Sequence, residues 1–161
     1  MKIRKEFIEK YKPASEILIK EFGSNINTAI IAGSGIAESI DTNKIVAEID
    51  YDELSNLPKT SVSGHSGKAV LYTLDNINSI IFSGRFHYYE GRSIDEICSL
   101  VILSKLIGVE KLVITNAAGS LNPQHKTGDI MFIEDYIDFL FYKSNHIFFD
   151  ENDFLVQNIK N

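Results

Sequence analysis

The residues best suited to chemistry stand in one short run, residues 84–91, with the sequence Gly-Arg-Phe-His-Tyr-Tyr-Glu-Gly. A guanidinium offers a fork of N–H donors that matches the oxygens of phosphate or carboxylate, and an imidazole can donate to the same anion. In an extended segment alternate side chains share one face, so Arg85, His87 and Tyr89 are predicted to point the same way. The run therefore indicates an anion site bordered by an aromatic ring.

Each of these side chains also has a structural interpretation. Arg85 could instead form an internal ion pair with Glu90, and a single histidine is more often structural than catalytic. One of Tyr88 and Tyr89 is expected to belong to the core. The position of the run directly behind an apolar strand favours the site, because open α/β sheets bind ligands beyond the carboxyl ends of their strands.

A glycine turn, Gly33-Ser34-Gly35, follows another apolar run. Backbone N–H groups in such a turn can surround an anion, and the Ser34 hydroxyl adds a donor. A dinucleotide-binding fingerprint would need a third glycine, and Glu38 occupies that place. The turn is thus a candidate anion site rather than a nucleotide motif, although tight turns also use glycine without any ligand.

Two further motifs are candidates of the same kind. In residues 64–67 two glycines flank His65 and Ser66, which could expose both side chains to a cavity or form an ordinary solvent loop. Residues 116–119, Asn-Ala-Ala-Gly, are small enough for backbone amides to approach a ligand, although small residues also serve tight packing.

Metal chemistry finds little support in the sequence. Cys98 is the only cysteine, which excludes an intramolecular disulfide and a zinc site built on several thiolates, and it falls among apolar residues as an inert core thiol. The histidines lack the compact spacing of metal ligands, and they are His65, His87, His125 and His146. No metal is predicted.

Strands and helices must position these motifs. Apolar runs predict strands at residues 28–32, 45–49, 69–74, 77–82, 111–115 and 129–137, of which 28–32 and 111–115 are expected to be buried and 45–49 to form an edge. Asp75-Asn76 predicts a hairpin turn, so the sheet should be mixed. Helices are predicted at 4–22, kinked or divided by Pro13, and from a capping box at 93–96 to about 107. The sequence therefore indicates an α/β fold with a mixed central sheet flanked by helices.

The overall composition limits the partners. The chain has 161 residues, 44% of them hydrophobic, which suits one domain. With 22 acidic and 16 basic residues the net charge is -6, which argues against nucleic-acid binding. No apolar run is long enough to span a membrane, and the charged start lacks the apolar core of a signal peptide, so a cytoplasmic location is expected.

The motifs together resemble the trimeric-type purine nucleoside phosphorylases in order and spacing. The resemblance covers about residues 14–138, and the motifs that carry it are Gly33-Ser34-Gly35, Gly64-His65-Ser66-Gly67, residues 84–91, Asn116-Ala117-Ala118-Gly119-Ser120-Leu121-Asn122-Pro123 and Gly128-Asp129-Ile130-Met131. The chain is accordingly interpreted as a single domain, with the amino-terminal part of a nucleoside phosphorylase in residues 1–138 and a divergent segment in 139–161.

This resemblance implies a phosphorylase/hydrolase-like fold and the phosphorolysis of purine nucleosides to free base and (deoxy)ribose 1-phosphate. It places phosphate against Ser34, His65, Arg85, His87 and the backbone amide of Ala117, with Arg85 and His87 as catalytic residues. Tyr89 would contact the ribose. Inorganic phosphate is then a co-substrate, and neither a metal nor an organic cofactor is implied. The implied partners are nucleoside and phosphate, in a homotrimer or with a complementing chain.

The sequence also departs from that family. Its members are longer, and their second half supplies the residues that bind the purine, so the fold is expected to be incomplete and no purine-binding residue is assigned in this chain. An S-methyl-5'-thioadenosine phosphorylase is an alternative, although such proteins usually carry cysteine where Ala118 stands. A non-catalytic remnant that binds phosphate or a partner is the other alternative.

Overall fold

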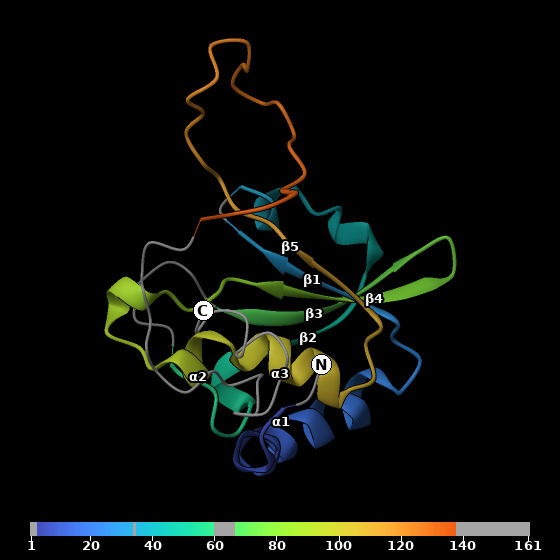
Figure 1. Cartoon of the computed structure of the whole chain (residues 1–161). Helices are drawn as coiled ribbons and strands as arrows, with labels where there is room; N and C mark the ends of the chain where they lie inside the picture. The colour runs from blue at the N-terminus through green and yellow to red at the C-terminus, as the bar shows by residue number, and fades with distance from the viewer. Residues whose placement is uncertain (1–2, 34, 60–66, 138–161) are drawn as a thin grey trace.

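Five strands form one mixed sheet in the order β2-β3-β4-β1-β5 (Figure 1). The computed structural model describes residues 3–33, 35–59 and 67–137. The strands are β1 (Thr28–Ala32), β2 (Ile45–Asp50), β3 (Lys68–Leu74), β4 (Ile77–Ser83) and β5 (Lys111–Ile114). β1 pairs in parallel with β4 and β5, whereas β3 pairs antiparallel with β2 and β4. The prediction of a mixed sheet with β2 at its edge is confirmed.

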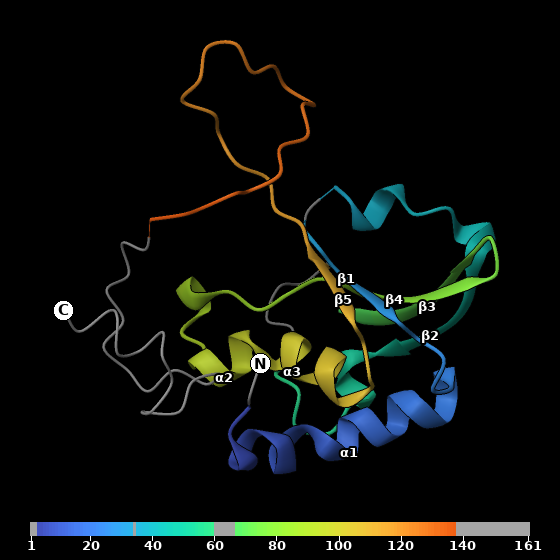
Figure 2. The same ribbon diagram turned by 45° about the vertical axis from the view of Figure 1, so that its right-hand side comes forward.

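Three helices lie on one side of this sheet, as Figures 1 and 2 show. They are α1 (Lys5–Phe22), α2 (Ile94–Ile97) and α3 (Ser99–Leu106). α1 continues through Pro13, so of the two predicted outcomes the division of the helix is wrong, and the kink stays a prediction. Tyr11 and Ala14 on either side of Pro13 are fully buried, and this packing holds the helix together across the missing hydrogen bond.

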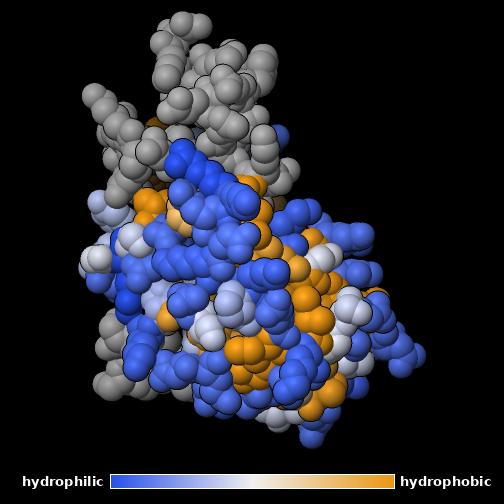
Figure 3. Space-filling model, turned by 90° about the horizontal axis from the view of Figure 1, so that it is seen from below, coloured by the Kyte–Doolittle hydropathy of each residue, from blue (hydrophilic) through white to orange (hydrophobic). Residues whose placement is uncertain are grey.

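The main core lies between the helices and the sheet. Its fully buried side chains include Leu18 of α1, Ile80 and Phe82 of β4, and Leu100, Ile102 and Leu103 of α3. A smaller cluster of Ala32, Val70 and Ile81 lies on the opposite face of the sheet. Seen from below, the molecule carries apolar residues between hydrophilic ones (Figure 3). The main core therefore packs one face of the sheet against the helices.

The hairpin between β3 and β4 forms as predicted. Asp75 and Asn76 both have positive φ, 50° and 63°, as a two-residue type I′ turn requires. Thr73 Oγ1 donates to Asn78 Oδ1 at 2.7 Å just inside the turn. The hairpin therefore sets the register of the two strands that lead toward residue 84.

The capping box at the start of α2 is also confirmed. Ser93 donates to the Glu96 carboxylate through its backbone N–H at 2.9 Å and through its hydroxyl at 2.8 Å. The predicted single helix is interrupted at Cys98, where ψ is 0°. Burial, followed by the nearby Asp95 charge, raises the pKa of the Cys98 thiol to about 11, which agrees with an inert thiol.

Two strand predictions are wrong at the other edge of the sheet. All four residues of β5 are exposed, because among the described residues only β1 pairs with this strand. Residues 129–137 form no strand and are exposed as well. They belong to a long loop after β5 that projects from the body of the molecule (Figures 1 and 2).

Candidate functional site

The carboxyl ends of β4, β1 and β5 bring together residues of two predicted motifs and the residue directly before a third. Gly33 follows β1, Arg85 follows β4, and Thr115 follows β5. The Gly33 N–H donates to Thr115 Oγ1 at 2.8 Å, and Arg85 Nη1 donates to the Thr115 carbonyl oxygen at 2.7 Å. Parallel strands present their carboxyl ends at one edge, which is why segments distant in sequence meet here.

Position 33 must be glycine, because here the chain after β1 passes close to the backbone at the end of β5. A Cβ added to it would lie 2.7 Å from the Thr115 carbonyl oxygen, closer than real Cβ contacts allow. The backbone rather than a flexible side chain would clash. The first glycine of the turn is therefore required by close packing of two strand ends, independently of any ligand.

Arg85 is half-buried and held by backbone. Its bond to Thr115 uses one of the five N–H donors of a guanidinium. Phe86, which comes next, is 3% exposed and packs against the ring of Tyr51 with centroids 5.8 Å apart. With Phe86 anchored in the core, Arg85 and His87 lie outside it, as the alternation predicts.

The extended geometry ends at His87. Residues Tyr88–Glu90 form the short 3-10 helix η4, and the Tyr89 side chain is 81% exposed. The His87 and Tyr89 rings nevertheless stack, with centroids 4.7 Å apart and planes inclined by 14°. Tyr89 thus lies beside His87, but the extended alternation that was predicted to bring Arg85, His87 and Tyr89 onto one face is wrong at Tyr89. Tyr88 is also exposed, so the expectation of one core tyrosine is wrong.

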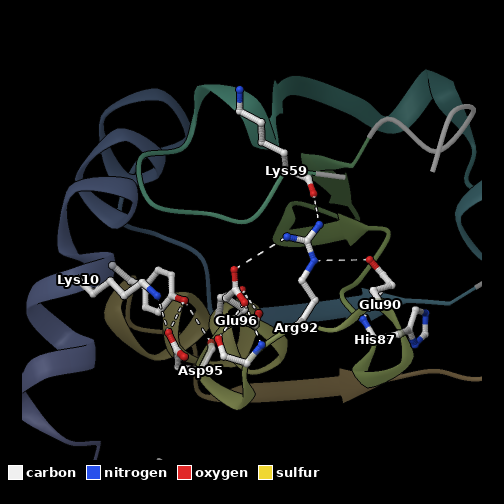
Figure 4. A network of polar contacts seen from close by, with 10 residues as sticks. Lys10, Lys59, His87, Glu90, Arg92, Asp95 and Glu96 are labelled. Atoms are coloured by element: carbon white, nitrogen blue, oxygen red, sulfur yellow. Dashed lines mark hydrogen bonds and ion pairs between the residues drawn. The ribbon is translucent and has the colours of Figure 1, made fainter. Parts of the chain in front are cut away.

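Arg92, which was not identified from the sequence, follows η4 and contacts several of its neighbours (Figure 4). Its side chain is 19% exposed and donates to the Lys59 carbonyl oxygen. Its nitrogens lie 3.7 Å from a Glu90 oxygen and 3.9 Å from a Glu96 oxygen. The other Glu90 oxygen accepts from the His87 N–H at 3.0 Å. The Arg92 cation therefore lies beside the Glu90 carboxylate, which accepts the hydrogen bond from the His87 N–H.

Arg85 and Glu90, the alternative ion pair, each lie beside another group in the structure. Glu90 has a neighbouring cation in Arg92, and Arg85 has an acceptor in Thr115.

The sequence did contain a signal for the ion pairs of Arg92. Two glutamates, Glu90 and Glu96, lie close to it in sequence, and residues four apart, such as Arg92 and Glu96, can pair on a helix. Nothing local in the sequence indicated the contact with Lys59.

The other predicted site residues are placed less closely. Ala117 lies two residues beyond Thr115 in an exposed segment. Ser34 and His65 lie outside the described residues. Within the described ranges, no cluster of three or more His, Cys, Asp or Glu side chains could hold a metal ion. No helix in the same ranges is long and apolar enough to cross a membrane.

The sequence profile of the Phosphorylase superfamily matches residues 27–158. The chain belongs to this superfamily. It is 37% identical to purine nucleoside phosphorylase 1 of Geobacillus stearothermophilus over 125 residues, which cover 78% of this chain and 46% of that protein. It is 38% identical to purine nucleoside phosphorylase of Mus musculus over 130 residues, covering 81% and 45%. This superfamily member thus spans about half the length of the curated relatives it matches.

The fold agrees with the sequence match. The crystal structure of Schistosoma mansoni purine nucleoside phosphorylase in complex with inosine superposes with a TM-score of 0.65 at 36% identity, covering 76% of this chain and 42% of that one. The resemblance to purine nucleoside phosphorylases and the α/β fold class, with only part of the fold present, are confirmed. The boundary at residue 138 stays a prediction.

Proposed function

We propose that this chain carries the phosphate-binding part of a purine nucleoside phosphorylase. Such an enzyme cleaves a purine nucleoside with inorganic phosphate, giving free base and (deoxy)ribose 1-phosphate. The observation that carries the proposal is the convergence of Gly33, Arg85 and Thr115 at one sheet edge, in a chain that is 37% identical over 125 residues to one such enzyme. A relative of similar fold is described in complex with inosine, which fits this substrate class.

The proposed reaction uses charge at that edge. A phosphate oxygen forms a bond to the anomeric carbon while the bond to the purine nitrogen breaks, and the base leaves with the electron pair and is protonated. The ribosyl group becomes cationic on the way, so a phosphate held close beneath it stabilises the transition state. Arg85 and His87 hold the phosphate in this scheme, and hydrogen bonds to charged groups contribute about 1.5–3 kcal/mol each.

The remaining roles complete the proposed phosphate site. Ser34, His65 and the backbone amide of Ala117 are proposed to donate to the same anion, and Tyr89 to border the ribose beside His87. Phosphate enters as co-substrate, and the chemistry is proposed to need neither a metal nor an organic cofactor. A cytoplasmic location fits such an enzyme.

Purine binding is proposed to require polypeptide beyond the residues assigned above. The exposed edge of β5 supports this, because Leu112, Val113 and Ile114 are 36%, 48% and 56% exposed there. Unpaired strand edges with apolar side chains are normally covered in folded proteins. The cover is proposed to be a complementing chain, or further subunits in a homotrimer.

Calorimetric titration with inorganic phosphate tests the proposal directly. We expect binding by the unmodified protein, loss of binding in Arg85→Ala, and no change in the matched control Arg4→Ala, which lies at the start of α1. Release of hypoxanthine from inosine should depend on phosphate and be slow for the chain alone, since each missing transition-state contact costs about 10²-fold. Full enzyme rates from the chain alone would overturn the incomplete-site proposal, and preference for methylthioadenosine would overturn the substrate assignment. Phosphate binding without any turnover, even alongside a complementing chain, would identify a non-catalytic remnant.

A further inference from the structure

Thr115 contacts both other strand ends at the candidate site. Its N–H donates to the Ile31 carbonyl oxygen at 3.0 Å, which continues the pairing of β5 with β1. Its hydroxyl accepts from the Gly33 N–H, and its carbonyl accepts from Arg85. One residue therefore links the turn after β1 to the guanidinium after β4.

The Thr115 hydroxyl has a fixed orientation. It lies 2.8 Å from the Gly33 nitrogen and 3.4 Å from the Ile31 carbonyl oxygen. A hydroxyl carries one donor and two acceptor positions, so it donates to Ile31 while it accepts from Gly33. A valine would fill the same space and could do neither.

We infer that Thr115 is a positioning residue for the phosphate site, setting the peptide plane at Gly33 and the guanidinium of Arg85 together. This rests on the proposed function. The Gly33 N–H is directed at Thr115, and this fixes the direction in which the glycine turn begins. The Thr115 carbonyl that holds Arg85 also makes the close approach to Gly33, at 2.7 Å from a would-be Cβ. A shift of either strand end therefore moves both groups.

The effect on phosphate should exceed the effect on folding. Loss of the hydroxyl removes the bond from Gly33 and the longer bond to Ile31 at a half-buried position, and it leaves the core side chains in place. When several groups bind one anion, the strength of binding depends steeply on their relative positions, and a misplacement of about 1 Å can reduce activity about 10²-fold. Thr115→Val should weaken phosphate binding about tenfold or more, whereas Thr115→Ser, which keeps the hydroxyl, should stay within about twofold.

Two readouts on the same variants test the inference. Phosphate affinity is measured by calorimetry, and exchange of the Gly33 amide hydrogen is followed by NMR. The matched control is Thr73→Val, which removes the 2.7 Å bond to Asn78 in the distant hairpin. We expect Thr115→Val alone to weaken phosphate binding and accelerate Gly33 exchange, with rescue by Thr115→Ser.

The outcomes separate the inference from the proposed function. Faster Gly33 exchange in Thr115→Val with unchanged phosphate affinity would overturn the positioning role alone. Equal weakening by Thr73→Val would show a general loss of stability and overturn it as well. Absence of phosphate binding by the unmodified protein would overturn the proposed function, and the positioning role with it.

Discussion

The phenol oxygen of Tyr51 lies 3.0 Å from the carbonyl oxygen of Gly84, to which it donates a hydrogen bond. Tyr51 is 1% exposed, and its ring contacts the rings of both Phe82 and Phe86. Burial raises the pKa of this phenol well above its ordinary value, so it stays a protonated donor. The core thus holds the residue directly before Arg85 in place.

Tyr51→Phe should lower stability by about 1–2 kcal/mol, because it leaves the Gly84 carbonyl without this partner while the ring packing is kept. Urea unfolding followed by circular dichroism measures the difference. Tyr136→Phe, at a residue that is 81% exposed, serves as the control and should change nothing. Equal stability of Tyr51→Phe and the unmodified protein would show that water replaces the bond.

Arg92→Met should weaken phosphate binding about tenfold, since it removes the cation beside the Glu90 carboxylate and so makes the field near His87 more negative, an effect on the order of 1 kcal/mol. Phosphate calorimetry measures this. Arg92→Lys keeps the charge and should lose less. The double variant Arg92→Met, Glu90→Gln should recover most of the affinity, and a double variant as weak as Arg92→Met would contradict the electrostatic explanation.

Asp95→Asn should destabilise the protein at pH 7 by about 1.5–3 kcal/mol, the range for hydrogen bonds to charged groups. Burial alone would raise the pKa of Asp95, but the hydrogen bond and charge of Lys10 and the hydrogen bond from Tyr11 outweigh it and hold this pKa below its ordinary value. The stabilisation is therefore present above the unfolded pKa of about 4 and is lost as the pH falls through the lower folded pKa.

Thermal unfolding between pH 7 and pH 2 checks this sign. The difference between the unmodified protein and Asp95→Asn should be largest near neutrality and should close in acid. Glu16→Gln is a matched control, because Glu16 forms an exposed pair with Lys12 at 4.0 Å. A difference that stays constant down to pH 2 would show that the Asp95 charge does not contribute.

Asn76→Gly should stabilise the hairpin by about 0.5 kcal/mol, because glycine adopts positive φ without the strain that a side chain adds. Thermal unfolding measures the gain. Asn78→Gly, within β4, should have the opposite sign, since it removes the bond to Thr73 and loosens a strand. Destabilisation by Asn76→Gly would mean that its side chain supports the turn.

Local patterns predicted much of this fold. The hairpin at Asp75-Asn76 and the capping box from Ser93 to Glu96 depend on neighbours in sequence, and both are confirmed. The strand predicted at 129–137 failed because apolar alternation forms a strand only beside a partner, and the described residues provide none there. Burial of β5 failed for the same reason.

The site was predictable by residue type and less so by contact. Arg85 and His87 stand out as chemical groups in any sequence, and the structure places Arg85 against the turn at Gly33 through Thr115. Thr115 itself gave no signal, because its partners lie 82 and 30 residues away along the chain. Arg92 was missed similarly, since its bond to Lys59 spans 33 residues.

The position of β1 in the sheet determines the order in which the strands can pair during synthesis. β1 is the first strand in the chain, yet its two neighbours in the sheet are β4 and β5. The β3–β4 hairpin closes over two residues, whereas Thr28 must meet Ser79 and Lys111, and longer loops close at greater entropic cost. We therefore expect the hairpin to form early as the polypeptide leaves the ribosome. The edge that gathers Gly33, Arg85 and Thr115 can close only after β5 has emerged.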